Sequence, residues 1–186
     1  MVLAQTAGNA FAAHMLPRPG QDEFASFFQG YIDRVPVGDV PQHLRAQGER
    51  TGALLGRVDE QKGMFRYAPG KWTVKRLVQH VVDGERLFGY RAMCIARGER
   101  GSLPAFDENA YAEHDGSDSR SLVSIATEYA SVRAATLTLF AGFDPAAWAR
   151  RGTANGKAIS VRALLWITAG HELHHLAVLR ERYGIG

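Results

Sequence analysis

Three histidines and one glutamate fall within five positions of the sequence, as HELHH at residues 171–175. Imidazole nitrogens bind late first-row metals, and two histidines one helical turn apart can hold the same ion. The stretch also satisfies the pattern H-E-x-x-H of zinc peptidases, in which the glutamate is the general base. The stretch could therefore be a peptidase site, a different metal site or a polar segment of an ordinary helix.

The positions around HELHH argue against the peptidase. In a metzincin the third ligand would stand at Glu181, and the motif glycine before it is replaced by Val178. Only eleven residues follow His175, so we expect no room for a substrate-side subdomain. The literal motif match is therefore not taken as evidence of proteolysis.

Helix geometry selects two of the three histidines. If residues 160–182 form a helix, each residue turns the side-chain direction by about 100°. His175 then falls inside the apolar stripe and His171 at its border, whereas His174 points toward solvent or a neighbouring subunit. Two inward histidines at i and i+4 favour metal binding over a pair of buried histidines hydrogen-bonded to backbone or carboxylate.

The third ligand is expected to be His80, in KWTVKRLVQHVVDGERLF. It lies at the border of another apolar stripe, where one helix edge meets a neighbouring helix. His14, His43 and His114 are poorer candidates because they fall in a leader, near a helix start and in a loop. Three histidines leave coordination positions open for water or substrate, as catalytic metals require. We expect one divalent ion, zinc or nickel.

Four segments with helical periodicity must position these histidines: residues 40–61, 73–97, 120–141 and 160–182. Thr73 and Ser160 are the expected N-caps of the second and fourth segments. A shorter helix is expected around 21–34, and no stretch alternates convincingly with a period of two. The pattern predicts an all-α four-helix bundle with short accessory helices. The long connection at 96–119 requires a crossover and could lie over a bundle end.

The composition is typical of one soluble domain. The 186 residues are 46% hydrophobic, which is enough for a sizeable core. No apolar run approaches the roughly 20 residues that span a bilayer, so no membrane is expected. We expect residues 1–15 to be a flexible leader and residues 16–186 to form a single domain.

Charge and cysteine content indicate which partners and which cellular compartment to expect. The 22 Lys and Arg and 19 Asp and Glu residues are interspersed, with a net charge of +3, so nucleic-acid binding is not expected. The single cysteine, Cys94, excludes an internal disulfide and suits a cytoplasmic protein. Cys94 itself is expected to be a core residue rather than a ligand or nucleophile.

With these motifs in view, the chain resembles the DinB-like superfamily. The resemblance rests on KWTVKRLVQHVVDGERLF, on FDENAY at 106–111 and on SVRALLWITAGHELHHLAVLRERYG at 160–184, and it covers nearly the whole chain from Leu16 to Tyr183. It implies a bundle of up-down-down-up topology, commonly dimeric, with a divalent metal on three histidines. Carried over by position, the ligands are His80, His171 and His175, the set that helix geometry also selects.

The resemblance implies several activities. Some members resemble thiol S-transferases or thiol-dependent isomerases that use a low-molecular-weight thiol as co-substrate, and others resemble metal-dependent hydrolases. A metal on three neutral imidazoles suits either, because it lowers the pKa of a bound thiol or water. We expect a thiol transferase that acts on a small-molecule substrate, and the resemblance implies a homodimer. The alternatives are a small-molecule hydrolase and a non-catalytic bundle that binds metal or a partner.

Two inward-facing acids need partners. Glu172 and Glu85 fall on apolar stripes, where a carboxylate requires a ligand's second ring nitrogen or an arginine such as Arg133 or Arg162. The alternative is a buried ion pair that holds the helices in register. From the sequence alone, Glu172 is also a candidate for a catalytic role.

The long loop contributes further candidates. We expect it to lie near the open face of the metal, where Asp107, Glu108, Asn109 and Tyr111 could contact substrate. Among these residues, Glu108 and Tyr111 are candidates for catalysis. The sequence does not identify the substrate, because substrate choice depends on the loop and the mouth of the bundle.

Overall fold

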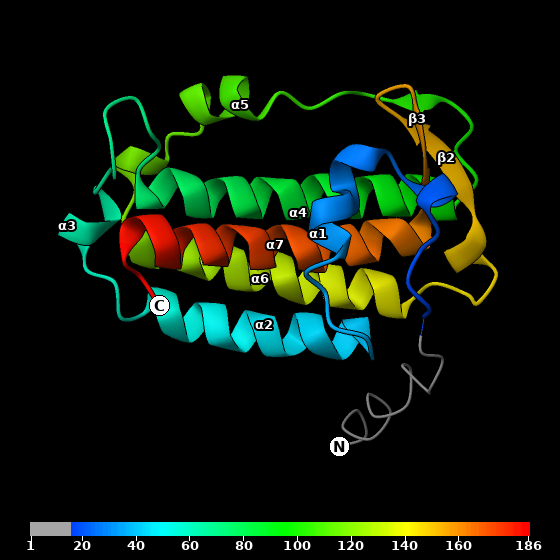
Figure 1. Cartoon of the computed structure of the whole chain (residues 1–186), viewed down its shortest axis with the longest axis horizontal. Helices are drawn as coiled ribbons and strands as arrows, with labels where there is room; N and C mark the ends of the chain where they lie inside the picture. The colour runs from blue at the N-terminus through cyan, green and yellow to red at the C-terminus, as the bar shows by residue number, and fades with distance from the viewer. Residues whose placement is uncertain (1–15) are drawn as a thin grey trace, which may run out of the picture.

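The structure is a computed structural model that describes residues 16–186. Its long helices are α2 (Val40–Leu55), α4 (Val74–Ala96), α6 (Leu122–Ala141) and α7 (Val161–Tyr183). Both α2 and α4 pack against α6 and α7, which closes a four-helix bundle (Figure 1). The predicted fold class is confirmed. The leader expected at residues 1–15 lies outside the described residues.

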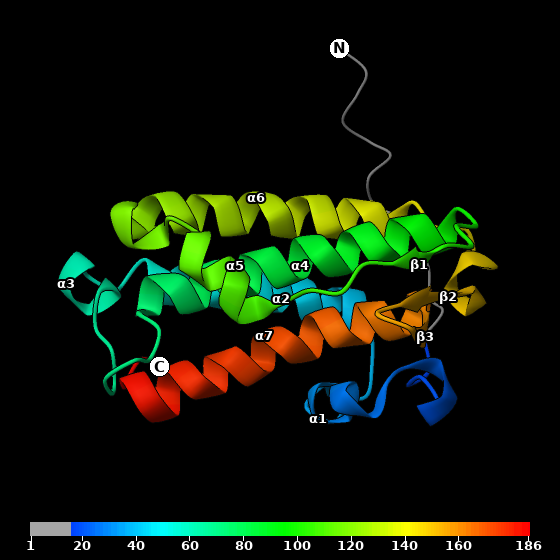
Figure 2. The ribbon, with the colours of Figure 1, turned by 90° about the horizontal axis from the view of Figure 1, so that it is seen from above.

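The direction of the helices gives the bundle its topology. Helices α2 and α7 run one way and α4 and α6 run the other way (Figure 1). Because α4 and α6 are neighbours and point the same way, the chain between them must return along the length of α4, about 35 Å. It does so over one side of the bundle (Figure 2), through β1 (Ser102–Leu103) and α5 (Glu108–His114). This is the predicted up-down-down-up order with its long crossover.

Local signals place the helix ends well, with one exception. Thr73 and Ser160 cap α4 and α7, each side-chain oxygen accepting from the backbone N–H three residues later. The first long helix, expected to reach residue 61, ends at Leu55. Asp59 caps a separate short helix, α3 (Glu60–Gly63), because its side chain offers the backbone an alternative to continuing α2.

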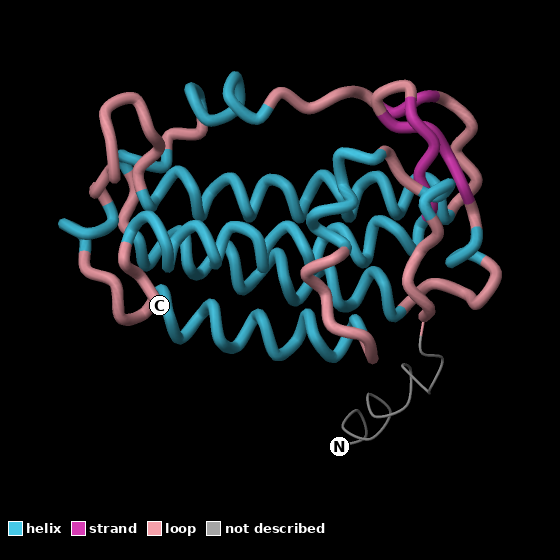
Figure 3. Tube along the Cα trace, viewed as in Figure 1, coloured by secondary structure: helices cyan, strands magenta, loops and turns pink. Residues whose placement is uncertain are grey.

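The sequence predicted no strands, and this prediction is wrong at one end of the bundle (Figure 3). A small sheet of order β1-β2-β3 pairs β1 in parallel with β2 (Arg151–Ala154), and β2 antiparallel with β3 (Lys157–Ser160). It lies at one end of the bundle (Figure 3). Asn155 and Gly156 form the hairpin turn with φ of 50° and 67°. An Asn-Gly pair is the sequence signal for such a turn, but strands of four residues are too short to show alternation.

The segment before α2 is broken rather than one helix over 21–34. It contains two 3₁₀ turns, Gln21–Glu23 and Ser26–Phe28, followed by the single turn α1 (Gln29–Ile32). This segment covers the outer side of α7 (Figure 2). Contact is close at Gly170, where a Cβ atom would lie 2.0 Å from the carbonyl oxygen of Tyr31. The first half of α7 is therefore buried on all sides, not along one stripe.

No helix within residues 16–186 has both the length and the apolar character needed to cross a membrane. The core instead forms two apolar clusters along the bundle. Buried side chains of α7 belong to both clusters, because Leu164 and Leu165 lie in one and Leu179 in the other. The other three long helices also contribute to both clusters, so each cluster joins the whole bundle.

A buried ion network joins the four helices between these clusters. Arg133 of α6 donates from Nε and Nη2 to the two carboxylate oxygens of Glu85 on α4, at 2.9 and 2.7 Å. Its Nη2 also donates to Glu172 on α7 at 2.7 Å, and its Nη1 to the carbonyl oxygen of Leu44 on α2 at 2.7 Å. The guanidinium thus contacts every helix of the bundle.

The second carboxylate oxygen of Glu172 is also satisfied. It accepts hydrogen bonds from the hydroxyls of Tyr129, at 2.5 Å, and Thr51, at 2.6 Å. Glu85, Arg133 and Glu172 are 3%, 4% and 1% exposed. Because buried charges are tolerated only when fully paired, these contacts fix the register of α4, α6 and α7 relative to one another.

Replacing Arg133 tests this role. Arg133→Met leaves two carboxylates buried without a cation, and we expect it to lower the free energy of unfolding by about 3–5 kcal/mol. Urea denaturation followed by circular dichroism measures the change. Arg151→Met is the matched control, because Arg151 pairs with Asp22 at the exposed surface, where such a pair contributes about 0–1 kcal/mol. Equal losses in the two variants would contradict the proposed role of the network.

Candidate metal centre

Three histidines from two helices meet beside this network. Nε2 of His80, on α4, lies 3.0 Å from Nε2 of His171 and 3.1 Å from Nε2 of His175, both on α7. The three potential ligand atoms all lie within 4.8 Å of one another. His80 and His171 are each 5% exposed, and His175 is half-buried. The residues singled out by helix geometry are therefore brought together.

The close contacts between the rings suit a shared cation. A neutral imidazole nitrogen carries one hydrogen or one lone pair, so Nε2 of His80 can make one good hydrogen bond but not two. Three nitrogens bound to one ion at about 2.0–2.1 Å in tetrahedral geometry would be separated by about 3.3 Å. The observed 3.0 and 3.1 Å separations are close to that value.

Burial keeps these rings neutral. Desolvation lowers the pKa of His80 to about 4 and that of His175 to about 2, and it lowers the pKa of His171 well below its ordinary value. At neutral pH the three rings therefore carry lone pairs rather than extra protons, as metal ligands must. Nδ1 of His175 is buried without a partner among the described residues.

The remaining histidines of the described chain lie outside the cluster. His174 is half-buried and packs against the ring of Tyr31, with centroids 5.3 Å apart. Helix α1 therefore covers His174, which the sequence placed toward solvent or a second subunit. His114 contacts a carbonyl of its own helix α5. His14 is not among the described residues.

A cavity of about 410 Å³ adjoins the cluster. One wall is a single face of α4, which carries His80 and, at successive turns, Gly84, Phe88 and Arg91. The other walls come from α7, the hairpin of β2 and β3, the segment before α2 and the crossover chain. Their lining residues include Phe27, Phe28, Tyr31, Phe106, Glu108, Asn155, Lys157 and His171.

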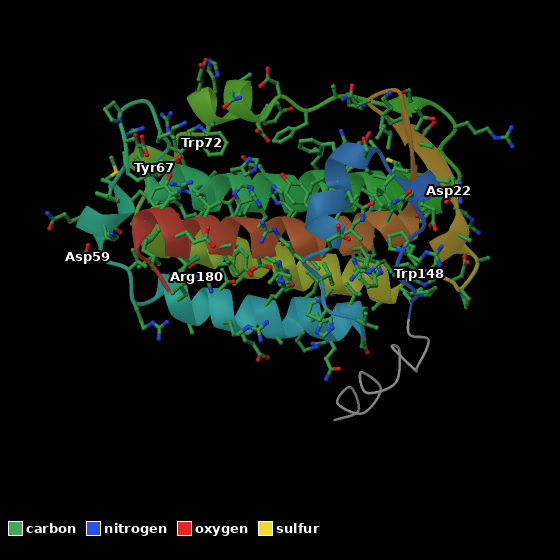
Figure 4. All side chains as sticks on the ribbon, in the orientation of Figure 1. Asp22, Asp59, Tyr67, Trp72, Trp148 and Arg180 are labelled. Carbon is green, nitrogen blue, oxygen red and sulfur yellow. The ribbon has the colours of Figure 1, made fainter. Side chains whose placement is uncertain are left out.

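Aromatic rings surround the two buried histidines. Trp72 and Phe106 lie against His80, with ring centroids 5.0 and 6.3 Å away. Tyr31 and Phe88 both lie 5.4 Å from His171. Such rings exclude water and lower the local dielectric constant, which strengthens electrostatic interactions at the nitrogens. Figure 4 shows Trp72 at the end of the bundle where α4 begins, opposite Trp148.

A glycine permits the two helices to approach at the cluster. A Cβ atom on Gly84 of α4 would lie 2.8 Å from Cε1 of His171. Any side chain at this position would push the imidazole aside. Sequence reasoning missed Gly84 and the aromatic wall, although Phe106 lies in the FDENAY segment that carries the family resemblance. A glycine inside a helical pattern is the signal that could have indicated this close approach.

Both inward-facing acids, Glu172 and Glu85, form buried ion pairs with Arg133. Both oxygens of Glu172 are used by Arg133, Tyr129 and Thr51, and Glu172 does not line the cavity beside the cluster. Glu85 is likewise paired with Arg133. Arg162, the other expected partner, pairs instead with Glu23.

The loop candidates divide among several roles. Glu108 lines the cavity, and Asp107 caps α5 through its side chain. Asn109 lies with His175 in a separate shallow pocket. Tyr111 is 57% exposed and rests on the ring of Phe106, 4.7 Å away. Cys94 is half-buried and packs against one of the apolar clusters, which fits the core role that the sequence suggested.

Comparison with known families decides the classification. The model of the DinB superfamily matches residues 43–179, which include His80, His171 and His175. The chain belongs to the DinB superfamily. No significant match is found among curated proteins.

Solved structures share the fold of this DinB protein at low sequence identity. YfiT from Bacillus subtilis, described as a probable metal-dependent hydrolase with an unusual four-helix bundle topology, is 17% identical with a TM-score of 0.67. The alignment covers 91% of this chain and 95% of YfiT. A mycothiol-dependent maleylpyruvate isomerase is 15% identical with a TM-score of 0.63, covering 78% of this chain and 61% of the isomerase. This chain therefore spans less than two thirds of the isomerase.

Acid should destabilise the metal-free protein through the histidine cluster. Below the unfolded pKa of about 6.5, the unfolded chain binds protons that the folded rings do not. Since the folded pKa of His80 is about 4, stability should fall as pH decreases from about 6.5 to about 4. In His80→Gln, we expect the fall in the free energy of unfolding over this pH range to be smaller by a few kcal/mol.

Urea denaturation over a pH series, with protein freed of metal by chelation, measures the effect. His114→Gln is the control, because His114 lies exposed on α5. If native protein and His80→Gln lose stability equally over this pH range, His80 is not held neutral by burial.

Proposed function

We propose that the protein is a metal-dependent enzyme that binds one divalent ion, zinc or nickel, on His80, His171 and His175. We further propose that it activates the thiol of a small molecule, as a thiol S-transferase does. The observation that carries the proposal is the convergence of three neutral, buried imidazole nitrogens at the edge of a cavity lined by aromatic rings. Imidazole ligands do not discriminate strongly between late first-row metals.

The state of Glu172 favours a thiol over water as nucleophile. A divalent ion on three neutral imidazoles keeps its charge and lowers the pKa of a bound thiol or water. Attack by water usually also needs a general base within hydrogen-bond reach. Glu172, the base that an H-E-x-x-H motif would supply, is engaged by Arg133 and two hydroxyls. A thiol has an ordinary pKa of about 8.5 and needs less assistance.

The structural relatives are compatible with either chemistry. YfiT is described as a probable metal-dependent hydrolase, and the maleylpyruvate isomerase depends on the thiol mycothiol. For hydrolysis by this chain, Glu108 is the best candidate for a base because its side chain lines the cavity. Hydrolysis of a small molecule is therefore the second candidate function. A bundle that binds metal without catalysis is the third.

Metal content tests the ligand set. We expect one equivalent of metal in protein purified without a histidine tag, and loss of most of it in His175→Ala. His174→Ala should retain nearly all of it, because His174 packs on Tyr31 outside the cluster. Elemental analysis provides the measurement, with circular dichroism to verify folding. Loss of metal from His174→Ala with retention in His175→Ala would refute the assignment.

Activity assays separate the candidate functions. Metal-loaded protein is incubated with low-molecular-weight thiols and an electrophile, and in parallel with ester and amide substrates. We expect thiol conjugation that chelation abolishes. Glu108→Gln should leave this conjugation largely intact, whereas it should slow a Glu108-assisted hydrolysis by about 100-fold. Hydrolysis without any thiol would favour the second function, and metal binding with neither activity would favour the third.

A further inference from the structure

Arg91 lies in the same cavity as the histidine cluster, farther along α4. It follows His80 by eleven residues, three helical turns or about 16 Å along the axis. Its side chain lines the cavity, yet the residue is only 5% exposed. A ligand in the cavity could therefore extend from the histidines toward a buried guanidinium.

This guanidinium has no anionic partner among residues 16–186. Its Nη2 donates to the carbonyl oxygen of Pro104 at 2.7 Å, and its Nε is buried without a partner among the described residues. No carboxylate of residues 16–186 forms an ion pair with it. The contrast with Arg133, which binds two carboxylates, is large, because an unpaired buried charge is costly.

The cavity lining contains further polar side chains besides Arg91 and the histidines. Asn155 and Lys157 of the hairpin line it together with Arg91. The acidic residue of the lining, Glu108, acts on Tyr31, whose pKa is raised first by burial and then by the Glu108 charge. Tyr31 lies against His171. Within residues 16–186, Glu108 forms no ion pair with Arg91, so the acidic residue of the lining does not pair with the guanidinium.

We propose that Arg91 binds an anionic group, a carboxylate, of the substrate whose reacting part lies at the three histidines. The inference rests on the proposed function, because it takes the histidine cluster as the reacting end. Guanidinium N–H groups match the two oxygens of a carboxylate, and charge-assisted hydrogen bonds of this kind are the strong ones. A phosphate has the same chemistry, so the test includes both anions.

Cobalt-loaded protein provides a binding assay that needs no turnover. It is titrated with ω-mercaptocarboxylates of increasing chain length and with the matching neutral ω-mercaptoamides, and visible absorption reports binding. We expect carboxylates of suitable length to bind about tenfold more tightly than the amides. Arg91→Met should abolish the preference, and Arg91→Lys should keep part of it. Arg97→Met, which removes an exposed arginine just beyond α4, should leave the preference unchanged.

The outcomes separate the two proposals. If cobalt does not bind, the proposed function fails, and Arg91 is then tested in metal-free protein through the Nε–H resonance of Arg91 titrated with hexanoate and hexanamide. A shift with hexanoate alone supports the inference. If cobalt and thiols bind but native protein does not distinguish carboxylate from amide, the inference is overturned whether or not Arg91→Met folds. Tighter binding of ω-mercaptoalkyl phosphates than of carboxylates would overturn the choice of carboxylate.

Discussion

The guanidinium of Arg133 is the constraint on which the arrangement of the bundle depends. It bonds to Glu85, Glu172 and the carbonyl oxygen of Leu44, and so to all three helices around α6. Apolar packing is largely non-directional and tolerates sliding between helices. A buried ion network does not, because a shift of one turn would leave charges unpaired. The network therefore determines how α4 and α7 align.

That alignment determines the histidine cluster. Glu172 follows His171 directly, and Glu85 is five residues after His80, so pairing the two acids with Arg133 brings the imidazoles to the same level. Gly84 then permits the close approach that places His171 beside α4. The glutamate of the HELHH stretch is accordingly held within this network, where Arg133, Tyr129 and Thr51 engage both of its carboxylate oxygens.

The cavity depends on parts of the chain outside the bundle. Because α4 and α6 point the same way, the crossover chain must return along α4, which places Phe106 beside His80 and Glu108 in the cavity lining. The segment before α2 adds Tyr31 through its contact with Gly170. The cavity is thus completed by loops and short elements held by the bundle, an arrangement common among binding sites.

Local sequence patterns determined the helices, the caps at Thr73 and Ser160, and the i, i+4 spacing of His171 and His175, because helix geometry converts sequence spacing directly into side-chain direction. Other features were decided only by tertiary structure. The all-round burial of the first half of α7, the pairing of Glu172 with Arg133 and the absence of an anionic partner for Arg91 within residues 16–186 each depend on residues distant in sequence. Periodicity records which face of a helix is buried, but it does not record what lies opposite that face.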